Sequence, residues 1–468
     1  MKNTNGIIQQ SKYSALDGSS YSSNSSMSYN SNYPIGMKSP PGRGRGGSSP
    51  SATSKNNYLL LLTTLLLASF SACTSGQEVP DDDPSQTPLV QKDTSITDLK
   101  FTVEEAPEWT ALFNRKSGWL GGDGIFAIPL NGVDTPGAAS DTTTMLLFSD
   151  TLIGEIAENE ENKEEINFEM INNTVALLKG VEADENKLSF HWATDEAGKP
   201  KTIFIPGTPN SQPGDYYWLG DGFVNNAKGG DTYIFGYRIR NTEAESFGFE
   251  EVGNTLIIIP AGSRPPFTDQ RQIDTPFYLN ADTPDATGSL GAGLFVNTRE
   301  AGAPDPDGFL YVYGVRGKAK EVMVARVEPQ NIENFSAWRF WDGSSWQPEM
   351  SKAAAIADRA SNEMSVSPLP DGRYAMVFQT DGIGRTVGLR LGLSPQGPFG
   401  PIIPLWDASK DVDVDKDFIS YNAKVHTNLS KPGELLISYN INSFDFFNDI
   451  KDHPNLYRPR FIRVKLEN

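Results

Sequence analysis

The chain has 468 residues, a formal net charge of −19 and a single cysteine. Residues 1–72 hold six Lys or Arg against one acidic residue, so the 396 residues that follow carry a charge of −24. Such an acidic surface argues against nucleic acids and anionic membrane surfaces as partners. One cysteine excludes an intrachain disulfide, so burial of apolar surface must supply the stability.

The N-terminal segment, residues 1–54, is rich in Ser, Asn, Gly and Tyr and has no stretch that could bury a core. We therefore expect it to be disordered. Its basic residues suit the positive region of a signal peptide, but that region is normally much shorter. This leads to the hypothesis that translation starts at Met37 and that the residues before it are not translated.

Residues 55–72 have the pattern of a lipoprotein signal peptide. The apolar run from Tyr58 to Phe70 is shorter than the roughly 20 residues of a membrane-spanning helix. Small residues then precede Cys73, whose thiol would accept the lipid, although Phe70 stands where Leu is commoner. An ordinary secretory signal and a membrane anchor are the alternatives. The pattern predicts a lipoprotein anchored to the bacterial outer membrane through Cys73.

Residues 73–97 form an acidic, Pro-containing tether. This tether resembles the acidic tract that directs lipoproteins to the cell exterior in some diderm bacteria. Exposure at the cell surface and a position facing the periplasm both stay open.

From residue 98 to 468 the chain is a succession of short apolar runs separated by Gly, Pro, Asp and Asn. Apolar, β-branched and aromatic residues dominate these runs, which indicates strands and an all-β protein. Only residues 155–170 and 351–363 could hold more than one turn of helix. Examples of the predicted strands are 144–150, 201–207, 231–239, 255–261, 308–316, 322–327, 374–380 and 434–440.

A loose repeat of 50–80 residues organises these strands, and each repeat would form a small antiparallel sheet. This pattern favours a five-bladed β-propeller, with a strand from one terminus completing the first or last blade. A pair of β-sandwiches is the alternative. The five units are 115–200, 201–290, 291–360, 361–408 and 417–468.

In a propeller the innermost strands converge on the axis, so an active site there takes polar residues from several blades. Asp123 and Asp221 both lie in glycine-flanked GDG turns one unit apart. Asp150 follows an apolar strand, and Glu363 precedes the first strand of the fourth unit. Each has a structural alternative, because Asp-Gly and Asp-Thr are common turn signals and Glu363 could cap a helix.

Asn422, Lys424 and His426 alternate along one predicted strand and should share a face. His426 could instead be a buried, hydrogen-bonded imidazole. Arg316 and Arg385 are further candidates for binding sugar hydroxyls. Four aromatic side chains could stack on sugar rings or pack between blades: Trp119, Trp218, Trp341 and Tyr421.

Other chemistries find little support in the sequence. His191, His426 and His453 are too widely spaced for a zinc motif, and neither a phosphate-binding loop nor a GxSxG elbow occurs. No cofactor or metal is predicted, although a calcium ion on the axis stays open. The acidic run 412–417 is interpreted as a solvated loop. What remains is carboxylate chemistry, in which one protonated acid and one ionised carboxylate cleave a glycosidic bond.

A set of motifs between residues 115 and 468 resembles a bacterial family known only as a domain of unknown function. The motifs are GWLGGDGIFAIPL, LLFSDTLIG, EMSVSPLPDGRYAMVFQ, GLRLGLSPQGPFGP, YNAKVHTNLSKPGELLISYNINSFD and YRPRFIRV. Members of that family look like five-bladed propellers related to arabinan-cleaving glycosidases, and some are endo-D-arabinanases. The resemblance places Asp123 at the family's glycine-flanked acid and Asp150 at its SDT acid. The loop 155–200 is longer than usual for the family.

Together these features predict a monomeric, surface-anchored glycoside hydrolase that acts on a polysaccharide, with an arabinan-like substrate as the expectation from the resemblance. Asp123 would act as base or nucleophile and Glu363 as proton donor, with Asp150 or Asp221 orienting them. A non-catalytic carbohydrate-binding lipoprotein on the same scaffold is the alternative. A third reading is a structural surface protein without an axial pocket.

Overall fold

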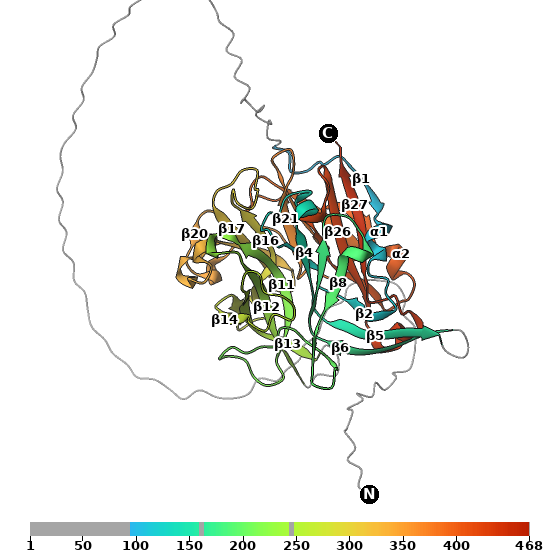
Figure 1. Cartoon of the computed structure of the whole chain (residues 1–468). Coiled ribbons are helices and arrows are strands. Elements are labelled where there is room, and N and C mark those ends of the chain that lie inside the picture. Colours follow the sequence, from blue (N-terminus) through green and yellow to red (C-terminus); the bar gives the residue numbers. More distant parts are fainter. Residues whose placement is uncertain (1–93, 159–162, 243–247, 468) are drawn as a thin grey trace, which may run out of the picture. The chain divides into compact units, whose positions relative to one another are not determined.

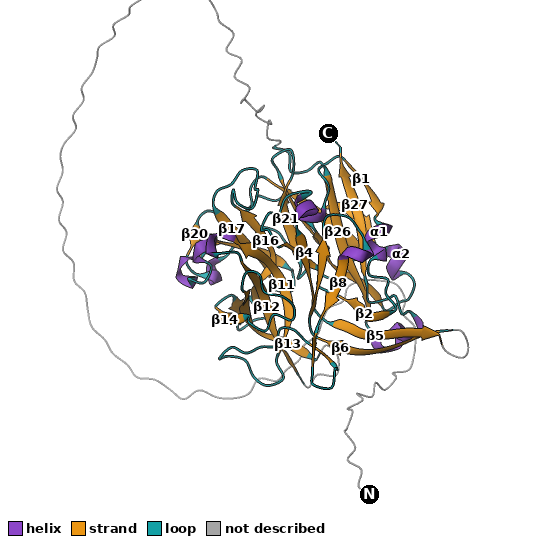
Figure 2. Ribbon diagram, viewed as in Figure 1, coloured by secondary structure: helices purple, strands orange, loops and turns teal. Residues whose placement is uncertain are grey.

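The computed structural model describes residues 94–158, 163–242 and 248–467. The predicted disordered segment, the signal peptide, Cys73 and most of the tether lie outside these residues. Within them, strands dominate and helices are short (Figures 1 and 2), which confirms the prediction of an all-β protein. No helix in the described ranges is long and apolar enough to cross a membrane.

Five antiparallel sheets hold most of the strands. In the order of their pairing, the first sheet contains β3 (Phe126–Pro129), β4 (Thr143–Phe148), β7 (Thr174–Lys179) and β8 (Leu188–His191). The second contains β11 (Tyr216–Asn225), β12 (Asp231–Asn241), β13 (Phe249–Ile259) and β14 (Arg271–Thr275). The third contains β15 (Tyr278–Leu279), β16 (Gly288–Asn297), β17 (Phe309–Arg316), β18 (Glu321–Val327), β19 (Arg339–Trp341) and β20 (Trp346–Gln347).

The fourth sheet contains β21 (Met364–Pro368), β22 (Tyr374–Gln379), β23 (Thr386–Gly392) and β24 (Ile403–Asp407). The fifth contains β25 (Phe418–Val425), β26 (Glu434–Ser443), β27 (Pro459–Leu466) and β1 (Phe101–Glu105). Two smaller sheets are formed by β2 (Ser117–Gly122), β5 (Thr151–Glu158) and β6 (Glu164–Ile171), and by β9 (Ala193–Thr194) and β10 (Pro200–Lys201).

The described helices are α1 (Pro107–Ala111), α2 (Ser409–Val412) and α3 (Phe446–Asp452). Short 3-10 turns occupy Ala138–Asp141, Glu185–Lys187, Asn226–Lys228, Pro329–Asn331, Phe335–Ala337, Met350–Lys352 and Thr427–Leu429.

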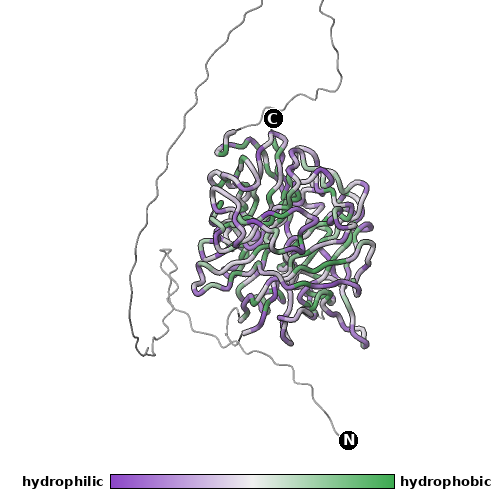
Figure 3. Tube along the Cα trace, turned by 90° about the vertical axis from the view of Figure 1, so that its left-hand side faces the viewer, coloured by the Kyte–Doolittle hydropathy of each residue, from purple (hydrophilic) through white to green (hydrophobic). Residues whose placement is uncertain are grey.

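Both faces of the sheets carry apolar side chains into the core, because successive residues of a strand point to opposite faces. On β12, Phe235 packs with Leu290 of the third sheet, whereas its neighbour Ile234 packs with Ile128 of the first sheet. Hydrophobic stretches therefore run through the interior, and hydrophilic residues gather at many of the outer turns (Figure 3). Each burial removes a large apolar side chain from water and stabilises the fold by roughly 1.5–3 kcal/mol.

One strand from each of the five larger sheets lines a common cavity, and these strands are β3, β11, β16, β21 and β25. They follow one another in space as they do in sequence, since β3 lies beside β11, β11 beside β16, β16 beside β21 and β21 beside β25. Side chains that are far apart in the sequence therefore meet at this cavity.

The N-terminal strand joins the C-terminal sheet. β1 pairs antiparallel with β27, from Phe101 opposite Leu466 to Glu105 opposite Ile462. A strand from one terminus thus completes the last sheet, as the sequence predicts.

The structure corrects four predictions about elements. Residues 155–158 and 164–170 are strand, in β5 and β6, and the only helical part of 351–363 is the end of one 3-10 turn. Most of 201–207 is a loop. Its apolar composition reflects the burial of Phe204 in the core, which takes place without strand pairing. The boundary between 290 and 291 falls inside β16, which belongs wholly to the third sheet.

Candidate functional site

Irregular pairing places polar side chains at the site. In β11 the register shifts between Leu219 and Gly222, and in β25 it shifts between Tyr421 and Lys424. Such a bulge adds a residue to one strand and redirects its side chains. Asn422 sits in the second shift with φ of 59°, a left-handed conformation that Asn tolerates better than most residues.

Asp123 follows β2 and is surrounded by hydroxyl groups. The Tyr421 hydroxyl donates to its Oδ2 at 2.8 Å, and the Tyr457 hydroxyl also bonds the carboxylate. Burial raises the pKa of Asp123, and the two tyrosine hydroxyls oppose that rise. Its Oδ1 is out of contact with solvent and has no hydrogen-bond partner among the described residues. Asp123 therefore has one oxygen held in place and one unpaired.

Asp150 lies directly beside Asp123, whose backbone N–H donates to the Asp150 carbonyl at 3.3 Å. The Asp150 carboxylate accepts one hydrogen bond from Asn172 Nδ2 and one from Trp218 Nε1, both at 3.2 Å. Burial raises the pKa of Asp150 to about 7, and the charge of Asp123 adds to the rise. The two carboxyls therefore favour a state in which one proton remains bound.

Glu363, the residue directly before β21, also lies near Asp123. It is 8% exposed, accepts a hydrogen bond from Asn422 Nδ2 at 2.8 Å, and forms an ion pair with Lys424, which is 1% exposed. A Cβ added to Gly124, the neighbour of Asp123, would lie 3.3 Å from Glu363 Oε1. Burial raises the pKa of Glu363 to about 7; Lys424 opposes the rise and Asp123 adds to it. Asp123, Asp150 and Glu363 thus belong to one cluster.

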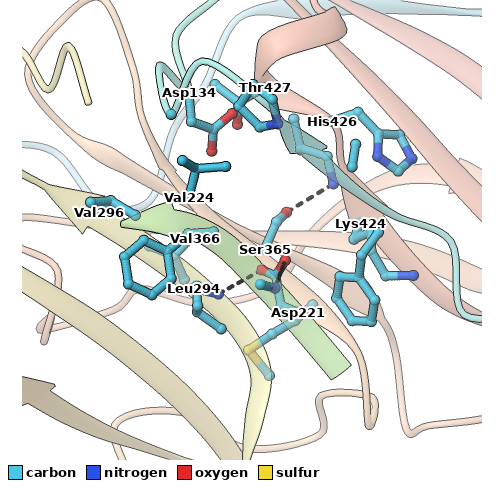
Figure 4. A pocket seen from close by; sticks show the side chains of 18 residues that line it. Asp134, Asp221, Val224, Leu294, Val296, Ser365, Val366, Lys424, His426 and Thr427 are labelled. Atoms are coloured by element: carbon cyan, nitrogen blue, oxygen red, sulfur yellow. Dashed lines mark hydrogen bonds between the residues drawn. The ribbon is translucent and has the colours of Figure 1, made fainter. Parts of the chain in front are cut away.

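Asp221 is fixed by the backbone and faces the cavity lined by β3, β11, β16, β21 and β25. Its two carboxylate oxygens accept hydrogen bonds from the backbone N–H groups of Gly222 and Leu294, each at 2.8 Å. The cavity has a volume of about 40 Å³, and Asp134, Lys424 and His426 also line it (Figure 4). Burial raises the pKa of Asp221 to about 7, with a smaller contribution from Asp134. Asp221 therefore ties β11 to β16.

His426 lies deep beside the cavity. Its Nε2 is 2.8 Å from the Ser438 hydroxyl, and its ring packs against Phe461 at 5.8 Å between centroids. Burial lowers the pKa of His426 to about 3, with Lys424 contributing, so the imidazole is neutral at ordinary pH. Asn422 and Lys424 share Glu363 as a partner, whereas His426 takes the buried, hydrogen-bonded position.

The remaining predicted residues are distributed unevenly. Trp218 lies at the site through its bond to Asp150, and Tyr421 through its bond to Asp123. Trp119 is 1% exposed and packs on Phe190 with 4.7 Å between ring centroids, so its ring cannot reach a ligand.

Three further candidates are occupied elsewhere. Arg316 pairs with Glu321 at 2.9 Å and bonds the Ala353 carbonyl, and exposed Arg385 pairs with Asp413. Trp341 packs against Trp346 within the third sheet.

Sequence reasoning did not select Asn172 and Tyr457. Asn172 follows β6 and stands in no quoted motif, whereas Tyr457 precedes β27 and opens the motif YRPRFIRV. Their roles depend on contacts across the fold, so the motif at Tyr457 was the one local signal that could have drawn attention to either residue. Lys424 was placed on the right face by alternation alone.

Among the described residues, one set of three carboxylates has the spacing of metal ligands. Asp415, Asp417 and Asp449 bring ligand atoms within 4.8 Å of one another, and the predicted acidic loop 412–417 overlaps this group. Asp417 also pairs with Lys416, and Asp449 accepts from Ser443.

The cluster around Asp123 has the components of acid–base catalysis. It combines a hydroxyl-bonded carboxylate, two carboxyls with pKa values near 7, and a buried lysine. A general acid works best when its pKa lies near the working pH. The fold and site together define an all-β protein with an acidic centre at the meeting point of several sheets.

The chain belongs to the family described as a domain of unknown function, DUF5005, which it matches over residues 107–466. No curated protein matches it.

Among solved structures, the chain is similar to a Bacteroides ovatus protein provisionally described as a hydrolase. That match has a TM-score of 0.58 and 21% identity, and covers 77% of this chain and 90% of the other. An α-L-arabinofuranosidase from Podospora anserina, solved with cellotriose, matches at a TM-score of 0.39 and 11% identity, over 75% and 98%. A GH43_1 enzyme from Xanthomonas citri, solved with xylotriose, matches at 0.35 and 13%, over 73% and 89%.

Proposed function

We propose that the protein is a glycoside hydrolase that cleaves a neutral polysaccharide at the Asp123–Asp150–Glu363 cluster. The observation that carries the proposal is this meeting of three carboxyls with raised pKa values: Asp123 and Asp150 flank the paired strands β2 and β5, and Glu363 comes from the start of β21 in another sheet. We also infer that the five sheets are the five blades of a propeller with its axis at the cavity. The resemblance makes an arabinan-like chain the first substrate to test.

The roles follow from the partners of each group. Asp123, bonded by two tyrosine hydroxyls, is suited to act as base or nucleophile in its ionised form. Glu363, with a pKa of about 7, is suited to hold a proton and give it to the leaving oxygen. Asp150, whose pKa the charge of Asp123 raises, would keep a proton beside Asp123, and Asp221 would hold the strands.

The test is hydrolysis of a panel of arabinan, xylan, galactan and β-glucan by the soluble domain from residue 94 onward. We expect Asp123→Asn and Glu363→Gln each to lower kcat by about 10³-fold, with little change in melting temperature. Asp141→Asn, at an exposed acid in a 3-10 turn, is the matched control. Full activity in both site variants would reject the proposal.

A carbohydrate-binding protein without catalysis is the second candidate. The ion pair between Lys424 and Glu363 favours it, because a carboxylate held by a buried cation is less able to carry a proton. Binding of an oligosaccharide without release of any product from the whole panel would select this candidate.

We also propose, from the sequence, that lipid on Cys73 anchors the protein to the outer membrane. Incorporation of labelled fatty acid into the full chain, and its loss in Cys73→Ser, would support this. Equal labelling of the two proteins would contradict it.

A further inference from the structure

Glu251 is a buried carboxyl that the proposed mechanism does not use. It lies on β13 opposite Ile239, next to a register shift between Arg238 and Ile239 of β12. The residue is partly exposed, but its Oε1 is out of contact with solvent and has no hydrogen-bond partner among the described residues. A buried polar atom without a partner costs about 1–3 kcal/mol. A ligand hydroxyl that reached this oxygen would remove that cost.

Tyr237 connects Glu251 with the catalytic cluster. After burial, the largest influences on the Tyr237 hydroxyl are the charges of Glu251, Glu363 and Asp221, all of which raise its pKa. The hydroxyl is therefore within electrostatic reach of all three carboxyls. Tyr237 also stands directly opposite Trp218 in the β11–β12 pairing, so the two side chains share one face of the sheet.

This face carries aromatic surface up to the catalytic cluster. Trp218 donates to Asp150 and makes an edge contact with Phe249, with 4.7 Å between ring centroids. Phe249 is 39% exposed and lies two residues before Glu251 on β13. Aromatic rings beside a few polar groups are typical of small-molecule sites.

We propose that Glu251, Tyr237 and Trp218 form a second sugar subsite next to the cleavage site, in which Glu251 Oε1 hydrogen-bonds a hydroxyl of a neutral sugar. The proposal rests on the proposed function and adds where the polysaccharide chain runs. Burial raises the pKa of Glu251 to about 8, partly offset by the Ser289 hydroxyl, so the group is mostly protonated at neutral pH and can also donate. The acidic surroundings disfavour an anionic sugar.

The experiment is calorimetric binding of linear arabino-oligosaccharides of two to six residues to the Glu363→Gln domain, which does not turn them over. In that background we expect Glu251→Ala to weaken binding of the longer oligosaccharides at least tenfold and to leave the shortest unchanged. Glu251→Gln keeps a donor and an acceptor and should remain within threefold. Glu250→Ala, at the exposed neighbouring residue, is the control.

Because removal of a buried group can unfold a protein, Tyr237→Phe is the second variant, and circular dichroism verifies that each variant is folded. Tyr237→Phe should weaken binding of the same long oligosaccharides at least threefold. Unchanged affinities at every length in folded Glu251→Ala and Tyr237→Phe would overturn the subsite alone. Absence of binding and of cleavage across all the sugars would overturn the subsite and the proposed function together.

Discussion

Gly124 is the residue on which the spacing of the cluster depends. Its φ of 66° is left-handed, and an added Cβ would lie 2.9 Å from Ser149 Oγ and 3.3 Å from Glu363 Oε1. A side chain here meets both backbone strain and crowding against a catalytic group.

We therefore expect Gly124→Ala to abolish activity and to lower the free energy of unfolding by about 2–3 kcal/mol. Gly198 is also left-handed, with φ of 80°, and an added Cβ there would meet nothing within 4 Å. Gly198→Ala should cost only about 1 kcal/mol and keep full activity. Equal effects of the two substitutions in urea unfolding and hydrolysis assays would show that crowding at Gly124 is unimportant.

Lys424 sets the proton affinity of Glu363. Its charge opposes the effect of burial, so its removal should raise the pKa of Glu363 above the present value of about 7. A proton donor must be protonated to act, and the alkaline limb of the pH–rate profile follows its pKa. Lys424→Met should therefore move that limb to higher pH.

The measurement is kcat/KM from pH 5 to 10 for the wild type, Lys424→Met and the exposed control Lys416→Met. A limb at the same pH in all three proteins would mean that Glu363 is not the titrating acid.

At the scale of elements, β1 joins the N-terminal end of the described chain to the C-terminal sheet. It pairs with β27 over five residues, and Arg373 donates to the carbonyls of Ser95 and Asp98 just before it. A domain that starts at Ala106 lacks all of these contacts and leaves an edge of β27 unpaired.

We expect this shortened domain to lose roughly 3 kcal/mol of unfolding free energy relative to one that starts at Thr94. Urea unfolding of the two proteins, followed by tryptophan fluorescence, measures the difference. The same midpoint in both would show that β1 is dispensable.

The sequence predicted the strands well because alternation and turn residues are local signals. It predicted a strand at 201–207 wrongly, since an apolar run in a buried loop has the same composition. It selected Asp123, Asp150 and Glu363, which the structure brings together, but it did not indicate a site role for Asn172 or Tyr457 or the positions of the bulges. Bulge positions and contacts between sheets depend on pairing partners that no local pattern specifies. Trp119 shows the same limit, because its burial is decided by neighbouring sheets.

At the scale of the whole described domain, several buried carboxyls have higher pKa values than exposed carboxyls, and therefore keep their protons to higher pH. Burial raises the pKa of Asp134 to about 6, of Asp150, Asp221 and Glu363 to about 7, and of Glu251 to about 8. In the unfolded chain these groups titrate near pH 4. Between pH 4 and 8 the folded state therefore binds more protons, so its stability falls as the pH rises.

We expect the free energy of unfolding to be highest near pH 4–5 and to decrease steadily towards pH 8. Groups such as Glu333, whose pKa Arg271 lowers to about 2, reverse the trend at stronger acidity. Asp134→Asn should make the decline between pH 4 and 7 less steep without changing catalysis. Denaturant unfolding at a series of pH values is the measurement, and a stability that rises from pH 5 to 8 would contradict this account.

The pairing of β1 with β27 has a mechanical consequence. β1 begins seven residues after the start of the described chain and is the first strand that follows the proposed tether in the sequence. Any pull exerted through that tether acts first on the seam between β1 and β27, ahead of every other sheet. Resistance to shear forces in flowing fluid would then be set by five residue pairs and one arginine.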